Sequence, residues 1–529
     1  MQSFIRINGA DNVAVALRDL KAGEKQEMLI LQEDVPRGHK FALKFIGKDE
    51  NVIKYGNPIG HAKCDIKAGE HVHIHNLATN LGADEEYVYN PVRAKQQVAA
   101  DADHNRENGI VKEKNIDAGN TGIDGFVMGK AFDADNIMTD SVFKGYARPD
   151  GHVGVRNELW IVPTVGCVNS IVKSIEERCH NLATGNIDAV VAYNHPYGCS
   201  QMGDDQENTR EALAALIKHP NAGGVLVVGL GCENSNIGVL KEYLGDITGY
   251  NIEFMNCQDE EDELEKGTEL MQQLAEKAGV CVRTEQPVSR LIVGMKCGGS
   301  DGLSGITANP VVGVFSDLLT EQGGSTILTE VPEMFGAERL LMNRACSREI
   351  FEKTVKLIKD FKDYYRKNNQ TIYENPSPGN KAGGISTLED KALGCTQKSG
   401  SAPVMDVLDY AQTLKTTGLN LLSAPGNDMV AATALALSGA QLVLFTTGRG
   451  TPFSTVVPTV KLSTNSPLAE KKNHWIDFDC GVLLKDGETV ENLGEKLFGY
   501  VLEVASGEKV KSEQAGFRDL AVFKTGVTL

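Results

Sequence analysis

The sequence lacks the features of several large classes of protein. Its apolar runs all fall short of the ~20 residues that a transmembrane helix needs. The N-terminus, MQSFIRINGADN, has no basic segment followed by an apolar core, so no secretory signal is expected. Positive charge is scarce, because 53 Lys and Arg stand against 71 Asp and Glu, a net charge of −18. Such acidity disfavours nucleic acid and anionic membranes as partners. We therefore expect a cytoplasmic protein.

Sequence motifs for disulfide scaffolds, zinc ribbons and nucleotide binding are missing too. The 11 cysteines are an odd number spread over 529 residues, and no CxxC pair occurs. A disulfide framework or a zinc ribbon is therefore not expected. There is no GxxxxGK[ST] motif, and no GxGxxG follows the first strand of a βαβ unit, so nucleotide binding is not favoured.

The chain length predicts roughly three domains. Residues 1–95 contain short β-branched or alternating runs separated by Gly, Pro and Asp turns, which predict a small β domain. Residues 96–143 are polar and Gly/Asn/Asp-rich, and they are expected to form a linker. From 144 onward strand-like runs alternate with helical periods, which predicts parallel sheets in a central α/β domain, 144–287, and a C-terminal α/β domain, 288–529.

Loops rich in Gly and in reactive side chains recur along the chain, and most of them directly follow a strand-like run. In an open α/β sheet, loops at the carboxyl ends of strands converge on the ligand crevice. We therefore expect one large polar active site. The loops are HPYGCSQMGDD (195–205), GLGCEN (229–234), MKCGGSDGLSGITANP (295–310), TEVPEMFG (329–336), ENPSPGNKAGG (374–384), SAPGND (423–428) and FTTGRGTP (445–452).

The motif HVHIH places His71, His73 and His75 at alternate positions, so on a strand they would share one face. Three imidazoles on one face suit a divalent transition metal. A solvated strand face is the competing interpretation.

Three cysteines, Cys199, Cys232 and Cys297, lie in Gly-rich loops. Two or three of them could bind Fe(II) or Zn(II), or hold an iron–sulfur cluster with one open site. Alternatively, these loops contain small residues only because backbones approach closely there.

Several loop residues are candidates for acid/base chemistry and for binding an anion. His195 follows a strand-like run and could transfer protons, or it could be a hydrogen-bonded loop histidine. Three carboxylates lie in short loops, Asp301, Glu330 and Asp428. They could bind a cation or a sugar hydroxyl, but carboxylates are also common in turns and helix caps. Lys381 and Arg449 are flanked by glycines, which suits a carboxylate or phosphate.

Long motifs over most of the chain resemble the altronate/galactarate dehydratase family. They include RGHKFAL, NVIKYGNPIG, AGEHVHIHN, GVRNELWIVPTVGCVN, YGCSQMGDD, KCGGSDGLSGITANP, LTEVPEMFGAE, YENPSPGNKAGGISTLEDKALGCTQK, GLNLLSAPGND and FTTGRGTP. The resemblance covers nearly everything outside 96–143, and HVHIH favours the altronate branch of the family.

The resemblance implies an N-terminal β-clip (SAF-like) domain, a central α/β domain that can mediate dimerisation, and a Rossmann-like C-terminal domain. The implied activity is dehydration of a sugar acid in galacturonate degradation, with D-altronate giving 2-dehydro-3-deoxy-D-gluconate. The family has an Fe(II) or Mn(II) requirement, and a homodimer is the expected assembly.

A dehydratase of this kind removes the proton next to a carboxylate and then expels the 3-hydroxyl, so it needs a cation, a base and an acid. We hypothesise His195, Lys381 and Asp301 as catalytic residues and Arg449 as the carboxylate clamp. The substrate hydroxyls would contact Asn309, Asn380 and Asn427. The metal would take ligands from His71, His73, Cys199 and Cys297, which requires the β domain to fold over the α/β crevice.

If the β domain does not fold over the crevice, Asp301, Glu330 and Asp428 become the better ligands. Two other functions stay open. One is a lyase acting on another α-hydroxy acid, such as galactarate or a sulfonated acid. The other is a protein that binds a ligand or stores metal without turnover.

Overall fold

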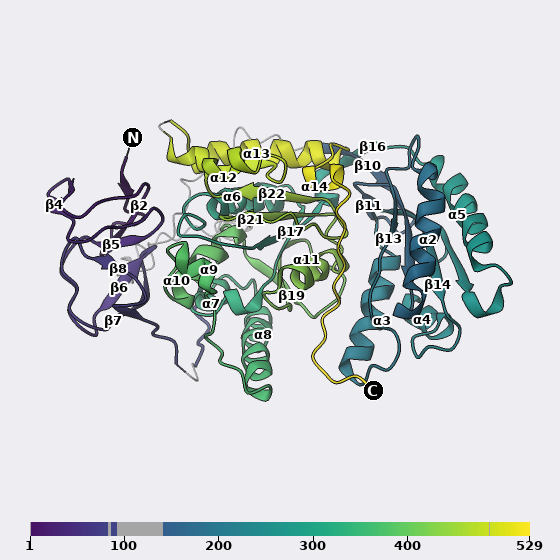
Figure 1. The fold of residues 1–529 in the computed structure, drawn as a ribbon, viewed down its shortest axis with the longest axis horizontal. Helices are drawn as coiled ribbons and strands as arrows, with labels where there is room; N and C mark the ends of the chain where they lie inside the picture. Colours follow the sequence, from purple (N-terminus) through teal and green to yellow (C-terminus); the bar gives the residue numbers. More distant parts are fainter. Residues whose placement is uncertain (1, 83–85, 92–140, 486) are drawn as a thin grey trace, which may run out of the picture.

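The structure is a computed structural model that describes residues 2–82, 86–91, 141–485 and 487–529. Three units follow one another across the molecule, with the N-terminal β domain at one end, the C-terminal domain in the centre and the middle domain at the other end (Figure 1). Most of the predicted linker, 96–143, lies outside the described residues.

Short antiparallel strands build the N-terminal domain. One sheet has the order β1-β2-β5-β8 and another the order β6-β7-β9, with a separate β3-β4 hairpin. Buried aliphatic side chains such as Val13, Val52 and Ile59 fill the space between them. The strands are β1 (Phe4–Ile5), β2 (Val13–Ala16), β3 (Lys25–Gln26), β4 (Leu29–Ile30), β5 (Lys40–Ala42), β6 (Asn51–Lys54), β7 (Asn57–Ala62), β8 (His71–Val72) and β9 (Leu77–Ala78).

The middle domain has a four-stranded parallel sheet of order β13-β12-β14-β15. Helices α2 and α5 pack together, as do α3 and α4. The alternation of strand and helix in the sequence correctly predicted this parallel arrangement. Its elements are β12 (Glu158–Pro163), α2 (Asn169–Cys179), β13 (Val190–Ala192), α3 (Asp204–Ile217), β14 (Ala222–Gly229), α4 (Ile237–Leu244), β15 (Ile252–Asn256) and α5 (Glu263–Gly279).

A small antiparallel sheet joins this domain to the next. Its order is β11-β10-β16, built from β10 (Val142–Ala147), β11 (Val153–Gly154) and β16 (Thr284–Pro287). The pairing of β10 with β16 brings the two ends of the middle domain together.

The C-terminal domain has a seven-stranded parallel sheet of order β19-β20-β18-β17-β21-β22-β23. Its strands are β17 (Ile292–Cys297), β18 (Ser325–Leu328), β19 (Val404–Leu408), β20 (Gly418–Leu422), β21 (Leu442–Thr447), β22 (Thr459–Ser463) and β23 (Phe478–Asp479). Its helices are α6 (Ala308–Glu321), α7 (Glu338–Met342), α8 (Arg348–Lys367), α9 (Pro378–Ala382), α10 (Leu388–Cys395), α11 (Asp428–Leu437), α12 (Ser466–Lys471), α13 (Val490–Ala505) and α14 (Lys511–Gln514).

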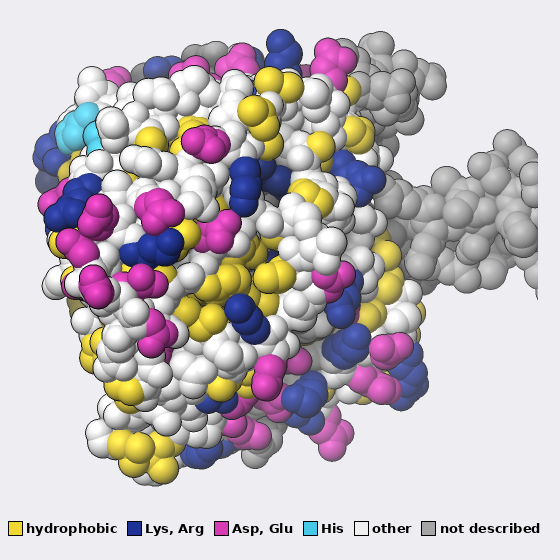
Figure 2. Space-filling view, turned by 90° about the vertical axis from the view of Figure 1, so that its right-hand side faces the viewer, with side chains coloured by type: hydrophobic (Ala, Val, Ile, Leu, Met, Phe, Trp, Pro, Cys, Tyr) yellow, Lys and Arg dark blue, Asp and Glu magenta, His cyan; other side chains and the backbone are white. Residues whose placement is uncertain are grey.

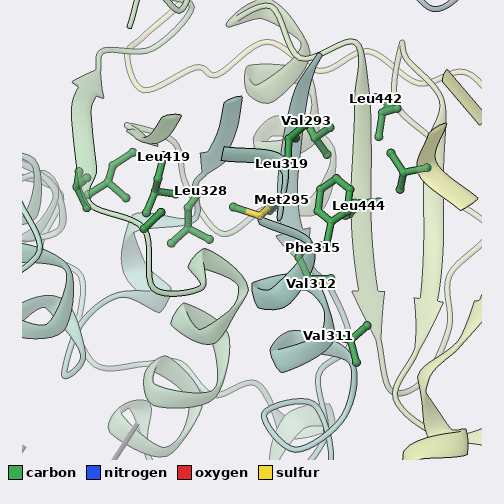
Figure 3. Close-up of a cluster of buried hydrophobic side chains, with 14 of the residues drawn as sticks. Val293, Met295, Val311, Val312, Phe315, Leu319, Leu328, Leu419, Leu442 and Leu444 are labelled. Atoms are coloured by element: carbon green, nitrogen blue, oxygen red, sulfur yellow. The ribbon is translucent and has the colours of Figure 1, made fainter. Parts of the chain in front are cut away.

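Helix α6 packs between the sheet and α13, and Figure 3 shows its Phe315 and Leu319 against Val293, Met295 and Leu444 of the sheet. These side chains are 0 % exposed, and burying each one contributes about 1.5–3 kcal/mol. On the other face α11 contacts α3 of the middle domain, so the apolar cores of the two domains are continuous. The C-terminal sheet is thus a rigid support for the loops at its carboxyl edge.

Seen from the middle-domain end, the surface carries side chains of both charge signs around a central hydrophobic patch (Figure 2). Within the described residues no helix combines the length and apolar character needed to cross a membrane.

Candidate functional site

The N-terminal domain meets the C-terminal domain through tight backbone contacts. The loop before β5 places Gly38 against the backbone of Gly302 and Gly384, where a Cβ on Gly302 would lie 1.9 Å from the Gly38 carbonyl oxygen. His39 Nε2 lies 3.3 Å from the Ala382 carbonyl oxygen. The β domain therefore docks onto the loops of the C-terminal domain that carry Gly302 and Gly384, and the metal hypothesis required such docking.

A cluster of four imidazoles lies at this junction. The ring centroid of His39 lies 5.1 Å from that of His71 and 4.9 Å from that of His73. The ring centroids of His71 and His75 are 5.5 Å apart. The prediction that HVHIH forms one strand face is wrong, because β8 ends at Val72.

The chain turns after Val72 and still brings the rings together. Asn76 holds the turn, accepting from the His73 N–H and donating to the His71 carbonyl oxygen. Sequence reasoning missed His39, which lies 32 residues from His71 in the chain. The signal that could have indicated it is weak: His39 follows Gly38 and directly precedes a strand.

Burial lowers the pKa of three of these rings, those of His39, His71 and His73. Burial, with added repulsion from His39, His73 and His75, lowers the pKa of His71 to about 3. Burial and the Lys40 ammonium lower the pKa of His73 to about 4. A metal binds the neutral imidazole, so the lowered pKa values of His71 and His73 favour the protonation state that a metal ligand needs.

The ligand atoms of Glu33, His71 and His75 lie within 4.8 Å of one another. Two imidazoles and one carboxylate with open positions form the donor set typical of non-haem Fe(II). The residues present therefore fit the expected Fe(II) or Mn(II). His73, a predicted ligand, instead contacts Ser386 Oγ through Nδ1 at 2.8 Å, and Glu33 was not predicted.

Lys40 and Lys54 anchor the N-terminal domain to α10 under this cluster. Their ammonium groups donate to the Asp390 carboxylate at 2.8 and 3.0 Å, and all three side chains are buried. Although burial opposes ionisation, the two ammonium groups hold the pKa of Asp390 well below its usual value. Lys40 also donates to Ser386 Oγ at 2.7 Å, which links this ion pair to His73.

Asp301 lies beside the histidine cluster, at the carboxyl edge of the C-terminal sheet. It accepts from Thr464 Oγ1 at 3.0 Å and from Ser304 Oγ at 3.1 Å, and burial raises its pKa. Gly383 and Gly448 pack against it so closely that a Cβ on Gly448 would lie 2.3 Å from the carboxyl carbon. A partly exposed carboxylate with a raised pKa suits acid/base work.

The two predicted anion-binding cations lie on loops that meet here. Arg449 is exposed and donates through Nη1 to the Gly379 carbonyl oxygen at 3.3 Å. That contact brings the 448–450 loop against α9, which carries the half-buried Lys381. The structure therefore brings together the loops that carry Asp301, Lys381 and Arg449.

Other predicted site residues are held by protein partners. Asn309 is 0 % exposed, donates to the Gly394 carbonyl oxygen and accepts from Thr446 Oγ1. Asn380 is buried and bonded to Ser300, Ser377 and Lys391. Asn427 caps α11 by accepting from the Met429 and Val430 N–H groups. Asn309 and Asn380 are buried with their amides engaged in structural contacts, which gives the substrate role predicted for them no geometric support. Asn427 is exposed, and its substrate role stays a prediction.

His195 lies in the middle domain, away from Asp301 and Lys381. It is 2 % exposed; its Nε2 contacts the Pro163 carbonyl oxygen at 2.8 Å, and its Nδ1 accepts from the Tyr197 N–H. Burial lowers its pKa. The structure therefore agrees with the other interpretation of His195, that of a hydrogen-bonded loop histidine.

The two predicted cysteine ligands lie in different domains. Cys199 is exposed in the middle domain and contacts Asn234. Cys297 is buried at the end of β17, with its Sγ 3.4 Å from Cys395 Sγ and 3.0 Å from Glu333 Oε2. The four predicted metal ligands therefore do not form one site.

The buried group around Cys297 is a second candidate site, and sequence reasoning missed Glu333, Cys395 and Lys398. Hydrogen bonding from Cys395 and the Lys398 ammonium, 3.1 Å from Cys297 Sγ, lower the pKa of the Cys297 thiol to about 6 against the effect of burial.

Glu330 and Asp428, the alternative metal ligands, pair instead with Lys296, at 3.2 and 2.7 Å. Each carboxylate therefore faces an ammonium group, which argues against a cation there.

Family models cover the chain in three parts. The altronate/galactarate dehydratase SAF domain matches residues 2–80, the second domain of D-galactarate dehydratase/altronate hydrolase matches 145–279, and the D-galactarate/altronate dehydratase C-terminal domain matches 288–528. The chain belongs to the altronate/galactarate dehydratase family.

Full-length relatives agree with this assignment. The chain is 50% identical to the altronate dehydratases of Bacillus subtilis (strain 168) and Escherichia coli (strain K12); the alignments cover 100% and 99% of this chain and all of each relative. It is 34% identical to the galactarate dehydratase (L-threo-forming) of Escherichia coli over 98% of this chain and 96% of that protein.

Proposed function

We propose that the protein is a hydro-lyase that dehydrates D-altronate to 2-dehydro-3-deoxy-D-gluconate and water. Support comes from two full-length relatives named altronate dehydratase at 50% identity, against 34% for the galactarate dehydratase. The observation that carries the proposal is the junction itself, where the histidine cluster of the N-terminal domain meets the loops of Asp301, Lys381 and Arg449.

We propose Fe(II) or Mn(II) as the cofactor, held by Glu33, His71 and His75. When bound, the divalent ion would stabilise the negative charge that builds up when the carbon next to the substrate carboxylate loses its proton.

The chain's own residues would supply the rest of the chemistry. Arg449, exposed on a loop between two glycines, would bind the substrate carboxylate. Asp301 would accept the proton from carbon 2, because its raised pKa brings it closer to neutral pH. Lys381 would donate a proton to the departing 3-hydroxyl. The resulting enol then becomes the 2-keto acid.

The test is anaerobic loading with Fe(II) or Mn(II), followed by assay of D-altronate, galactarate and sulfolactate with detection of the keto acid or sulfite. We expect Asp301→Asn to lose on the order of 10²–10⁴-fold in kcat while keeping its metal. We expect the His71→Ala/His75→Ala double variant to lose the metal as well.

Lys48→Met is a matched control from the same domain, since Lys48 is exposed on the turn before β6, away from the HVHIH segment in sequence. Preference for galactarate or sulfolactate would contradict the substrate assignment. Tight D-altronate binding with no turnover would support the non-catalytic alternative.

Three further proposals concern the whole protein. The C-terminal sheet, with early strands at its centre and later strands on both sides, supports a Rossmann-like description. The absence of membrane-spanning helices from the described residues is consistent with a cytoplasmic location. The central hydrophobic patch in Figure 2 is consistent with the predicted homodimer, which light scattering of the purified protein would test.

A further inference from the structure

Three exposed cysteines lie at the carboxyl edge of the middle-domain sheet. Cys167 follows β12, Cys199 follows β13 and Cys232 follows β14, and these strands are neighbours in the order β13-β12-β14. Adjacent strands are about 4.8 Å apart. All three thiols are exposed although cysteine is among the most buried residue types, so packing does not explain them.

Hydrogen bonds fix the loops that carry these thiols. The Gly166 N–H donates to the Tyr197 carbonyl oxygen at 2.9 Å, which joins the first loop to the second. Asn234 Oδ1 accepts from the Ser200 N–H at 3.1 Å and from Cys199 Sγ at 3.3 Å, which joins the second loop to the third. The three loops therefore form one connected surface.

Glycine makes this close approach of the loops possible. Gly198 has φ +98°, and a Cβ there would lie 1.9 Å from the Thr164 carbonyl oxygen. Gly231, directly before Cys232, has φ +124°. The loops after β12 and β14 lead to helices on opposite faces of the sheet, because α2 packs with α5 and α4 with α3. Such a switch point is where open α/β sheets bind ligands.

One limit on the separation of the three sulfurs, that they do not all lie within 4.8 Å of one another, bears on what they would bind. A single tetrahedral ion with 2.3 Å bonds to sulfur holds its sulfurs about 3.8 Å apart. In the described part of the chain, the groups of three ligand atoms within 4.8 Å of one another do not include this trio. A polynuclear cluster distributes its thiolates over different iron atoms and so tolerates a wider spacing.

We propose that Cys167, Cys199 and Cys232 bind an iron–sulfur cluster through three thiolates, which leaves one iron without a protein thiolate. This site differs from the histidine site in domain, in ligand chemistry and in requiring sulfide. It does not depend on the proposed function, and either one can fail without the other.

The experiment uses the full chain, purified anaerobically and reconstituted with ferrous iron and sulfide. We expect about four acid-labile sulfides per chain and a broad visible absorbance that dithionite bleaches. The triple variant Cys167→Ser/Cys199→Ser/Cys232→Ser should lose at least about fivefold of both signals, because its cluster ligands are gone.

Cys281→Ser is the matched control: Cys281 lies after α5 in the same domain, donates to the Lys277 carbonyl oxygen and should not affect the cluster. The His71→Ala/His75→Ala variant should keep its sulfide while losing the separate metal. Circular dichroism checks that each variant is folded. Wild-type protein without labile sulfide, binding of zinc alone, or a folded triple variant that keeps the cluster would overturn the proposal.

Discussion

At the scale of single residues, the fold changes the chemistry of the Cys297 thiol. It lies in a buried group with Cys395, Glu333 and Lys398, and its pKa falls to about 6 from an ordinary value near 8.5. Above that pH the metal-free protein should hold a thiolate here, and protonation should remove it as the pH falls through 6.

The ultraviolet absorbance of the thiolate, recorded as wild type minus Cys297→Ser during a pH titration, should show a midpoint near 6. Replacing Lys398 by Met removes the nearest positive charge and should raise this midpoint by at least about one pH unit. A midpoint that stays near 6 in Lys398→Met would mean that the ammonium group does not stabilise the thiolate.

The same scale shows where sequence reasoning succeeds and where it stops. The loops of Asp301, Lys381 and Arg449 were predicted to converge because Gly-rich loops after parallel strands meet at one edge of a sheet, and they do contact one another. The catalytic and binding roles of these residues stay predictions. His195 also lies in a loop after a strand, but its ring is hydrogen-bonded to the backbone of its own domain. His39 and Glu33 were missed because their partnership with His71 depends on packing between strands distant in sequence.

At the scale of elements, α10 joins two sites. Asp390 contacts the lysines of the N-terminal domain, whereas the next residue, Lys391, pairs with Glu333 at 2.7 Å and Cys395 contacts Cys297. Every residue of this helix is buried. Apolar periodicity cannot predict such a helix, because its charged residues Glu389, Asp390 and Lys391 are buried as well as its apolar ones.

Asp390→Asn should therefore destabilise the protein strongly. The change leaves the ammonium groups of Lys40 and Lys54 buried without a counterion, which costs about 3–5 kcal/mol of unfolding free energy. Urea denaturation at neutral pH measures it. Glu352→Gln, which breaks an exposed ion pair with Arg348 on α8, should cost less than about 1 kcal/mol. Equal losses in the two variants would contradict a special role for the buried pair.

At the scale of the whole molecule, the proposed active site exists only while the N-terminal domain stays docked. The alternation of strands and helices predicted both α/β sheets, since that pattern is local. The docking itself entered only as a condition of the metal hypothesis. Its contacts, which are the backbone approach of Gly38 to Gly302 and the buried ion pairs of Lys40 and Lys54 with Asp390, follow no recognisable motif.

Gly302→Ala should separate the histidine cluster from the loops of Asp301 and Arg449. The new methyl group would collide with the Gly38 carbonyl oxygen, so backbone must move. We expect kcat to fall at least about tenfold, since displacement of about 1 Å at a catalytic site can cost 10²-fold. Gly9→Ala, in the N-terminal domain with open space around it, should leave kcat within about twofold. Limited proteolysis should cut the N-terminal domain of Gly302→Ala faster than that of wild type, because undocking exposes the backbone around Gly38 and His39. Full activity together with an unchanged cleavage rate would mean that the catalytic groups do not depend on this junction, and the site would then have to be sought within the C-terminal domain alone.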